Sequence, residues 1–269
     1  MKVLIISDME GVAGISRWDQ VSADKPGYEE GRRLYTEEIN ATVRGAFAGG
    51  ATEVVVMDCH GAGGDRSFNS LIPDQLDGRI EFVVQTRWTE YTQFLEDGCD
   101  AALFVGQHAR AGADRGVLSH TVSSTSWHEL RFNGTAVGEV GINAALCGTW
   151  GCPVALVTGD DVVCQEAIEL LGSGLQTLAV KTGLGRFSAR HLSPATARTR
   201  LAQAAAAALS DLQSAPVYDP GAPCTIAVEL ATPDHADAYR NRVGVTLTGP
   251  RSVESRAPTW WDAWRALYL

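Results

Sequence analysis

The amino-acid sequence predicts an α/β fold with three layers, αβα, built around a mainly parallel central sheet. Short apolar runs of strand length alternate along the chain with segments of helical period, and this alternation is typical of βαβ units. The 269 residues, 45% of them hydrophobic, are enough for one large domain or two modest lobes with a real core. We therefore expect a single domain over residues 1–269, with room for a smaller C-terminal lobe.

Six apolar runs are the strand candidates of the central sheet. A continuous apolar run is typical of a strand that is buried on both faces, as the strands of a parallel sheet are. The six runs are, in chain order, Val3–Ile6, Val54–Met57, Phe82–Val84, Ala101–Val105, Val154–Val157 and Thr177–Val180.

Four segments of helical period lie between or behind these strands. Gly49-Gly50 follow the first of them, which suits a helix C-terminus, and Asp160 or Asp161 could cap the third. Ser193-Pro194 open the last, because proline is well suited to the first helical position. The predicted helices are Tyr28–Phe47, Glu139–Leu146, a segment that ends at Leu171, and the Ala-rich stretch Ala195–Leu212.

The composition changes near residues 217–223, where proline and glycine become frequent. This connector is the candidate boundary of the smaller lobe. Two strand-like runs follow it, Thr225–Leu230 and Val243–Leu247, and then a tryptophan-rich tail over residues 260–264. Internal packing and a subunit contact would each explain the tail.

Composition and charge disfavour two classes of partner. The 22 basic and 32 acidic residues give a net charge of −10, and no Lys/Arg cluster stands out, so we expect no nucleic-acid partner. No stretch reaches the length of a membrane span, and the N-terminus lacks the apolar core of a signal peptide. The six cysteines form no CxxC pair, so we expect reduced, mostly buried thiols and a cytoplasmic protein without a membrane partner.

Two carboxylates follow the first predicted strand. Asp8 and Glu10 come directly after Ser7, and the ligands of a doubly wound sheet gather at the carboxyl ends of its strands. If extended geometry persists past Ser7, both side chains point to one side, and Gly11 then lets the backbone turn away. A metal site explains this pair. A turn or cap role for Asp8 and a solvated charge at Glu10 explain it equally well.

Two histidines stand in matching places after later strands. His60 follows the run Val54–Met57 at the entrance of a glycine-rich loop, and His108 follows the run Ala101–Val105. A lone histidine after a strand is more often packed or hydrogen-bonded than a ligand. Combined with two carboxylates, however, the imidazoles suit zinc or a similar first-row divalent ion, and a site without thiolates is more typical of catalytic than of structural zinc.

Glu139 is the first residue of the second predicted helix and follows the tight turn at Asn133-Gly134 in the sequence. A glutamate in a first helical turn has an ordinary explanation, because it complements the positive end of the helix dipole. The residue type alone favours that explanation. A role as a ligand comes only from the wider pattern of motifs.

Taken in order, the motifs of the chain resemble the M55 family of metallopeptidases, the D-aminopeptidases. The resemblance covers roughly residues 2–181, and the remainder is compatible but less diagnostic. The motifs are Ser7-Asp8-Met9-Glu10-Gly11, Asp58-Cys59-His60-Gly61, Gly106-Gln107-His108-Ala109, Ser119-His120-Thr121, Asn133-Gly134, Gly138-Glu139-Val140-Gly141-Ile142-Asn143-Ala144, Pro153-Val154 and Thr158-Gly159-Asp160-Asp161.

The resemblance implies a centre of two Zn²⁺ ions per subunit, for which another first-row divalent metal would also suit. It implies a catalytic role for His120, as nucleophile, proton shuttle or oxyanion stabiliser; the alternative is a neutral histidine hydrogen-bonded inside the sheet. We expect surface or packing roles for His128, His191 and His235, which match no motif. The implied metal ligands are Asp8, which would bridge the two ions, Glu10, His60, His108 and Glu139.

Paired metal ions supply an activated water, polarise a carbonyl oxygen and hold both in place. The resemblance therefore implies an aminopeptidase that hydrolyses short peptides or amides with an N-terminal D-residue. It also implies a ring-like homo-oligomer, a decamer of two five-membered rings. Two other functions remain open: a cytosolic peptide-binding module without turnover, and a dinuclear hydrolase of another substrate class, such as phosphoesters.

Overall fold

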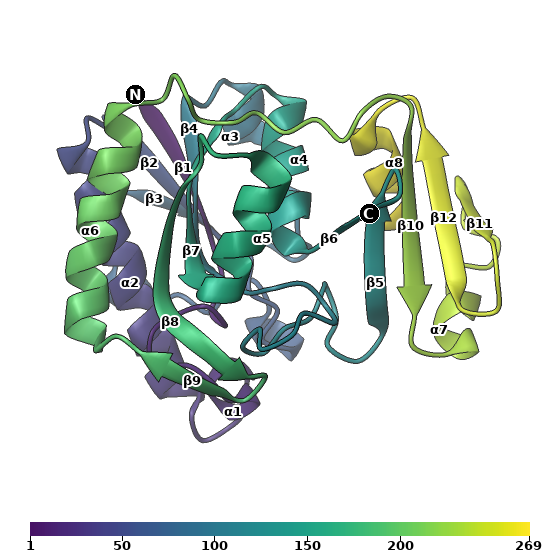
Figure 1. The fold of residues 1–269 in the computed structure, drawn as a ribbon, viewed down its shortest axis with the longest axis horizontal. Helices are drawn as coiled ribbons and strands as arrows, with labels where there is room; N and C mark the ends of the chain where they lie inside the picture. Colours follow the sequence, from purple (N-terminus) through teal and green to yellow (C-terminus); the bar gives the residue numbers. More distant parts are fainter.

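The computed structural model describes residues 1–269 and contains two sheets (Figure 1). The larger sheet has seven strands in the order β3-β2-β1-β4-β7-β8-β9, and all neighbours are parallel except the β8–β9 hairpin. The predicted mainly parallel sheet is therefore confirmed. Its strands are β1 (Lys2–Ser7), β2 (Glu53–Asp58), β3 (Glu81–Val83), β4 (Ala101–Gln107), β7 (Val154–Asp160), β8 (Gln176–Gly185) and β9 (Ser188–His191).

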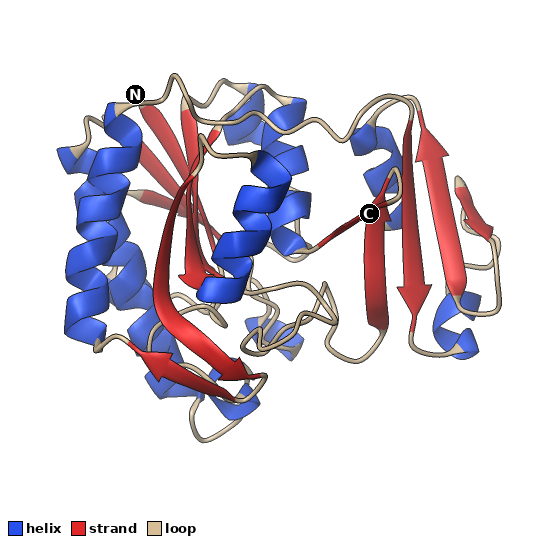
Figure 2. Ribbon diagram, in the orientation of Figure 1, coloured by secondary structure: helices blue, strands red, loops and turns tan.

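Helices cover both faces of this sheet, so the predicted three-layer architecture is also confirmed (Figure 2). Alternate residues of β1 show the two sides: Val3 and Ile5 share a core with α2 and α6, whereas Leu4 and Ile6 share one with α4 and α5. The long helices are α2 (Tyr28–Ala48), α4 (Glu139–Thr149), α5 (Asp161–Leu171) and α6 (Pro194–Ser210), and the short ones are α1 (Trp18–Val21), η1 (Gly64–Arg66), η2 (Pro73–Gln75) and α3 (Gln93–Glu96).

The predicted helix starts follow from capping side chains. Of the two candidate caps of α5, Asp160 is the one used, because its Oδ1 accepts a hydrogen bond from the Val163 amide at 2.8 Å. Ser193 caps α6 by accepting from the Thr196 amide at 3.3 Å, and Pro194 fills the first helical position. Helix α6 ends at Ser210, two residues before the predicted end.

The second sheet is antiparallel and has the strand order β11-β12-β10-β5-β6. The connector 217–223 leads into this sheet, as expected for a C-terminal lobe. The sheet also contains residues 127–137, which come from the middle of the chain. The sequence did not predict β5 or β6, because β5 is buried on one face only and lacks a continuous apolar run. The strands are β5 (Trp127–Phe132), β6 (Thr135–Val137), β10 (Cys224–Leu230), β11 (Val245–Leu247) and β12 (Ser252–Ala257), and the short helix α7 (Pro233–Asp237) follows β10.

The tryptophan-rich tail forms helix α8 (Trp260–Leu267), which packs against β10, β12 and α4. Trp260 and Trp264 are buried in the core shared with the second sheet, and the Trp264 indole donates a hydrogen bond to Thr89 Oγ1 at 2.8 Å. Internal packing thus accounts for these two side chains. The helix also brings Tyr268 close to the carboxyl end of the large sheet.

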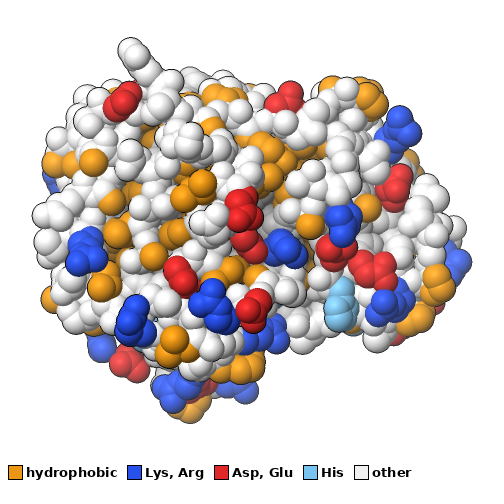
Figure 3. Space-filling view, viewed as in Figure 1, with side chains coloured by type: hydrophobic (Ala, Val, Ile, Leu, Met, Phe, Trp, Pro, Cys, Tyr) orange, Lys and Arg blue, Asp and Glu red, His pale blue; other side chains and the backbone are white.

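The cysteines, the surface charges and the histidines outside the motifs have the positions expected in a globular protein. All six cysteines are free, and five of them are buried. None of the helices combines the length and the apolar composition needed to cross a membrane. On the face drawn in Figure 3, basic and acidic side chains are interspersed. His128 is exposed, and His235 forms a hydrogen bond with Thr232 Oγ1 at the surface. His191 Nδ1 accepts a hydrogen bond from the Gly14 amide at 3.0 Å.

Candidate metal centre

The predicted ligands converge because three of their loops leave adjacent strands of the large sheet. Strand β1 lies between β2 and β4, and Ser7 pairs in register with both Asp58 and Val105. The carboxyl ends of the three strands are therefore level, and side chains that follow them meet at one edge. The residues that follow these ends are Asp8 and Glu10 after β1, His60 after β2 and His108 after β4, and the start of α4 adds Glu139.

The loop after β1 runs along the end of β4. The Asp8 amide donates to Val105 O at 2.9 Å, and the Gly11 amide donates to Gly106 O at 2.7 Å. A Cβ at Gly11 would lie 2.0 Å from Gln107 O, so no other residue fits there. We expected Gly11 to free the backbone for a turn, but its φ is not positive, and the close approach of two backbones is its actual role.

Asp8, Glu10 and His60 form one half of the centre. His60 Nδ1 lies 3.0 Å from Asp8 Oδ1 and 3.0 Å from Glu10 Oε2. The other ring nitrogen, Nε2, lies 2.7 Å from Val21 O. Donation of the Nε2 proton to that carbonyl fixes the tautomer. The other nitrogen, Nδ1, then keeps a lone pair that can bind a metal ion.

His108 and Glu139 form the other half together with the second oxygen of Asp8. His108 Nε2 lies 3.3 Å from Asp8 Oδ2 and 3.4 Å from Glu139 Oε1. Its Nδ1 lies 3.0 Å from Ala109 O, which fixes the tautomer in the same way. Asp8 therefore directs one oxygen toward each of the two histidines.

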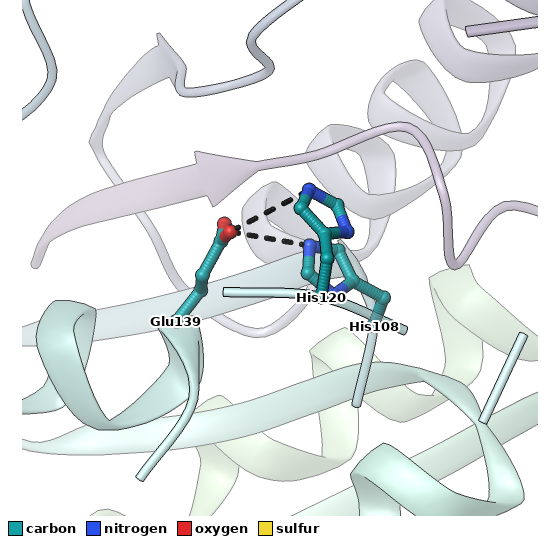
Figure 4. A group of neighbouring side chains, drawn as sticks. All are labelled: His108, His120 and Glu139. Atoms are coloured by element: carbon teal, nitrogen blue, oxygen red, sulfur yellow. Dashed lines mark ion pairs between the residues drawn. The ribbon is translucent and has the colours of Figure 1, made fainter. Parts of the chain in front are cut away.

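His120 lies in the loop between β4 and β5, and Figure 4 shows it beside His108, with both rings facing Glu139. Its ring stacks on that of His108 at 4.0 Å between centroids, and its Nε2 is 3.8 Å from Glu139 Oε1. Its Nδ1 is 2.9 Å from Leu118 O. The side chain is 13% exposed, whereas that of His108 is 1% exposed. The loop position does not match the alternative of a histidine inside the sheet.

The charges and the free atoms of this cluster fit a divalent cation. Burial, and then the Glu10 carboxylate, raise the pKa of Asp8 to about 7. Glu10 Oε2 and His108 Nε2 are buried, and although charged groups lie 3.0 to 3.4 Å away, neither atom makes a hydrogen bond of good geometry. Buried carboxylates that repel one another and buried polar atoms without partners are costly, and a cation between them removes both costs. Carboxylate oxygens and imidazole nitrogens are ligands that zinc accepts.

A comparison with known proteins places the chain in a family. The model of peptidase family M55, described as D-aminopeptidase, matches residues 1–269. The chain belongs to the M55 peptidase family. A D-aminopeptidase of Bacillus subtilis (strain 168) is 33% identical to it over 272 residues, which cover 100% of this chain and 96% of that relative. The predicted resemblance is confirmed, and it extends over the whole chain.

A solved structure supports the same assignment. The Zn-dependent D-aminopeptidase DppA from Bacillus subtilis, described as a self-compartmentalizing protease, matches this M55 chain with a TM-score of 0.91 and 32% identity. The match covers 99% of this chain and 95% of that chain. The protein is thus an enzyme of the hydrolase class, as its sequence predicted.

Lys181 supports the loop that carries Glu10 in this M55 enzyme, and the sequence did not point to it. The side chain is buried in β8, and its Nζ donates to Val12 O at 3.0 Å, to Ile15 O at 2.7 Å and to Glu10 O. A lysine in an apolar strand was the only sequence signal, because its partners are about 170 residues away along the chain. Glu38 and His191 accept from the amides of the same loop, those of Ala13 and Gly14.

We expect Lys181→Met to lower the free energy of unfolding by about 3 kcal/mol, because it leaves buried carbonyl oxygens without their donor. Urea denaturation of the metal-free protein measures this change. Lys25→Met is the matched control, since Lys25 is exposed, and its unfolding free energy should stay within about 0.5 kcal/mol of that of the wild type. Equal unfolding free energies for the two variants would contradict the proposed support.

Three cavities meet at His120 or beside it. One of about 200 Å³ is bounded by Glu10, Trp18, His60 and His120, and one of about 50 Å³ lies between the predicted ligands and Tyr268. The third, of about 560 Å³, runs from His120 outward to Arg186. Tyr268, at the far end of the chain, therefore lines the site although no motif marked it. A substrate can reach the centre of this M55 enzyme past His120.

Proposed function

We propose that the protein is a zinc-dependent aminopeptidase that hydrolyses short peptides or amides with an N-terminal D-residue at a dinuclear centre. The observation that carries this proposal is the position of Asp8, whose two oxygens face two different histidines at 3.0 and 3.3 Å. One subsite would consist of Asp8, Glu10 and His60, and the other of Asp8, His108 and Glu139. The similarity to a D-aminopeptidase and to a Zn-dependent D-aminopeptidase of Bacillus subtilis supports both the metal and the class of substrate.

Two zinc ions in these subsites would supply a water that loses its proton near neutral pH and would polarise the scissile carbonyl. The protein's own residues prepare the site for this chemistry. Glu139 Oε1 accepts a hydrogen bond from the Val122 amide at 2.8 Å, so a predicted ligand also holds the loop that carries His120. The bond from Nδ1 to Leu118 O leaves His120 Nε2 free to face the reacting groups.

His120 is suited to accept a proton and to return it. Burial, and then the neighbouring His108, lower the pKa of His120 to about 4, so the ring is neutral near pH 7. A neutral imidazole can take a proton at Nε2 and deliver it to the departing amine, which is general base and then general acid catalysis. The His120 side chain is 13% exposed against 1% for His108, and this greater access to substrate supports the role over that of a buried ligand.

We also propose that the chain forms a ring-like homo-oligomer, for which we expect a decamer of two five-membered rings. The description of DppA as a self-compartmentalizing protease supports an assembly of this kind. A ring encloses its active sites and thereby restricts access to short peptides. Light scattering on the purified protein measures the mass of the assembly, and a monomer at micromolar concentration would contradict the proposal.

The function is tested by removing and restoring the metal. We expect the chelated protein to release no amine from D-configured dipeptides, and we expect activity to return in proportion to zinc up to two equivalents per chain. L-configured dipeptides with the same side chains are the matched controls and should be cleaved at least about tenfold more slowly.

The same assay separates the two alternatives. Dipeptide binding in calorimetry without release of amine from the zinc-loaded protein would favour a peptide-binding module. Cleavage of an aryl phosphate without cleavage of any peptide or amino acid amide would favour a hydrolase of another class. Saturation of the activity at one equivalent of zinc would contradict the dinuclear centre and leave the peptidase activity standing.

A further inference from the structure

We propose that Arg186 binds the C-terminal carboxylate of a short peptide substrate and so favours peptides that end close to the scissile bond. The inference rests on the peptidase function proposed above and adds a residue that determines specificity. Arg186 lies at the tip of the β8–β9 hairpin, between Gly185 and Ser188, far from the metal ligands in the sequence.

The hairpin tip is bound to the loop that carries His120. Arg186 donates to Ser119 O from Nε at 3.2 Å and from Nη2 at 2.9 Å, and the Leu118 amide donates to Arg186 O at 2.8 Å. The guanidinium is thereby fixed on the residue that precedes His120. A fixed guanidinium loses little conformational freedom when it binds an anion.

One aromatic ring separates Arg186 from His120. The guanidinium carbon lies 5.5 Å from the centre of the Trp18 ring, and the Trp18 ring lies 5.4 Å from that of His120. The guanidinium is therefore no farther from the imidazole than about three residues of extended peptide, at roughly 3.6 Å per residue. The carboxylate of a dipeptide or a tripeptide that is cleaved beside His120 falls within this range.

Arg186 is the only lysine or arginine that lines the two larger cavities beside His120. It has no carboxylate within ion-pair distance, whereas the nearby Arg115 lies 3.8 Å from Asp114 and Arg110 lies 3.6 Å from Glu166. Its Nη1 makes no hydrogen bond within the protein. A peptide carboxylate is an anion that this free edge can bind, and guanidinium groups bind carboxylates well.

The test compares two substrates that differ only in charge, a D-configured dipeptide with a free carboxylate and the same dipeptide as its C-terminal amide. We expect Arg186→Gln to raise the KM of the free dipeptide about tenfold, with a change in kcat below about twofold, and to leave the KM of the amide unchanged. Arg186→Lys keeps the charge and should recover part of the loss. Arg190→Gln, on the same hairpin but away from the cavity, is the matched control and should change neither KM.

The outcomes are distinguishable. Equal losses on the free dipeptide and on its amide would overturn the inference, because they would show that Arg186 only holds the Ser119 loop. A wild-type enzyme that cleaves both substrates with equal KM would also overturn it and would leave the proposed peptidase function intact. A wild-type enzyme that cleaves neither substrate would overturn the proposed function and this inference with it. If Arg186→Gln fails to fold, Arg186→Lys and the wild-type comparison still decide.

Discussion

Asp8→Ala is expected to lose both zinc ions and to reduce turnover far more than 100-fold. Asp8 is the only side chain with one oxygen beside each histidine, 3.0 Å from His60 and 3.3 Å from His108, so both subsites lose a ligand at once. Substitutions of residues that merely orient metal ligands already cost roughly 10- to 100-fold. Zinc content after dialysis, measured by atomic emission, and turnover of a D-configured dipeptide give the two readings.

Glu10→Ala is the informative comparison for Asp8→Ala. Among the histidines, Glu10 Oε2 is within ion-pair distance of His60 alone, at 3.0 Å, so its removal should weaken mainly the His60 subsite and leave the other occupied. The exposed Glu30 on α2 provides a control, and Glu30→Ala should keep both ions. If Asp8→Ala retained one tightly bound ion while Glu10→Ala lost both, Asp8 would not be the bridge.

The loss in the Asp8 variant should not result from unfolding. In the absence of metal, burial and the repulsion by Glu10 make the charge of Asp8 unfavourable, as its pKa of about 7 indicates. We therefore expect metal-free Asp8→Ala to unfold at the same urea concentration as the metal-free wild type or at a higher one. A lower midpoint would show instead that Asp8 supports the fold without its metal.

The sequence could predict the large sheet because local signals specify its strands, whereas the full set of predicted metal ligands came from the resemblance to a family. Three of the ligand loops, those after β1, β2 and β4, follow continuous apolar runs, and parallel strands buried on both faces show such runs plainly. Glu139 begins helix α4 and has no such signal. Once β1, β2 and β4 are adjacent, Asp8, His60 and His108 must meet at the same edge. The five predicted ligands do come together in the structure, within direct reach of their neighbours.

The remaining features depend on contacts that no local pattern records. Strand β5 pairs with β10, which lies about 100 residues later, and its one-sided burial hides it from a search for apolar runs. Lys181, Arg186 and Tyr268 reach the site from segments that carry no motif of their own. Gly11 illustrates a subtler limit, since a glycine in a sequence does not show whether a turn or a close approach requires it.

His120→Ala is expected to retain both zinc ions and to lose about 10²- to 10⁴-fold in turnover, the range typical of a general acid–base residue. This variant tests whether two neighbouring histidines have different roles, because the stacked rings of His108 and His120 lie only 4.0 Å apart between centroids. His108 Nε2 faces two carboxylates at 3.3 and 3.4 Å, whereas His120 Nε2 approaches only Glu139, at 3.8 Å. His108→Ala should therefore lose metal and activity together.

One competing hypothesis is that His120 is itself a metal ligand. The variants His120→Ala and His108→Ala also test it. His108, His120 and Glu139 offer ligand atoms within 4.8 Å of one another, and so do Asp8, Glu10 and His108. If His120 were a ligand, His120→Ala would bind one zinc ion weakly, and added zinc would restore part of its turnover. If His120 moves protons, its variant binds zinc like the wild type, and excess zinc restores nothing. The second outcome is expected because the bond of His120 to Leu118 O places it on the solvent side, where substrate enters.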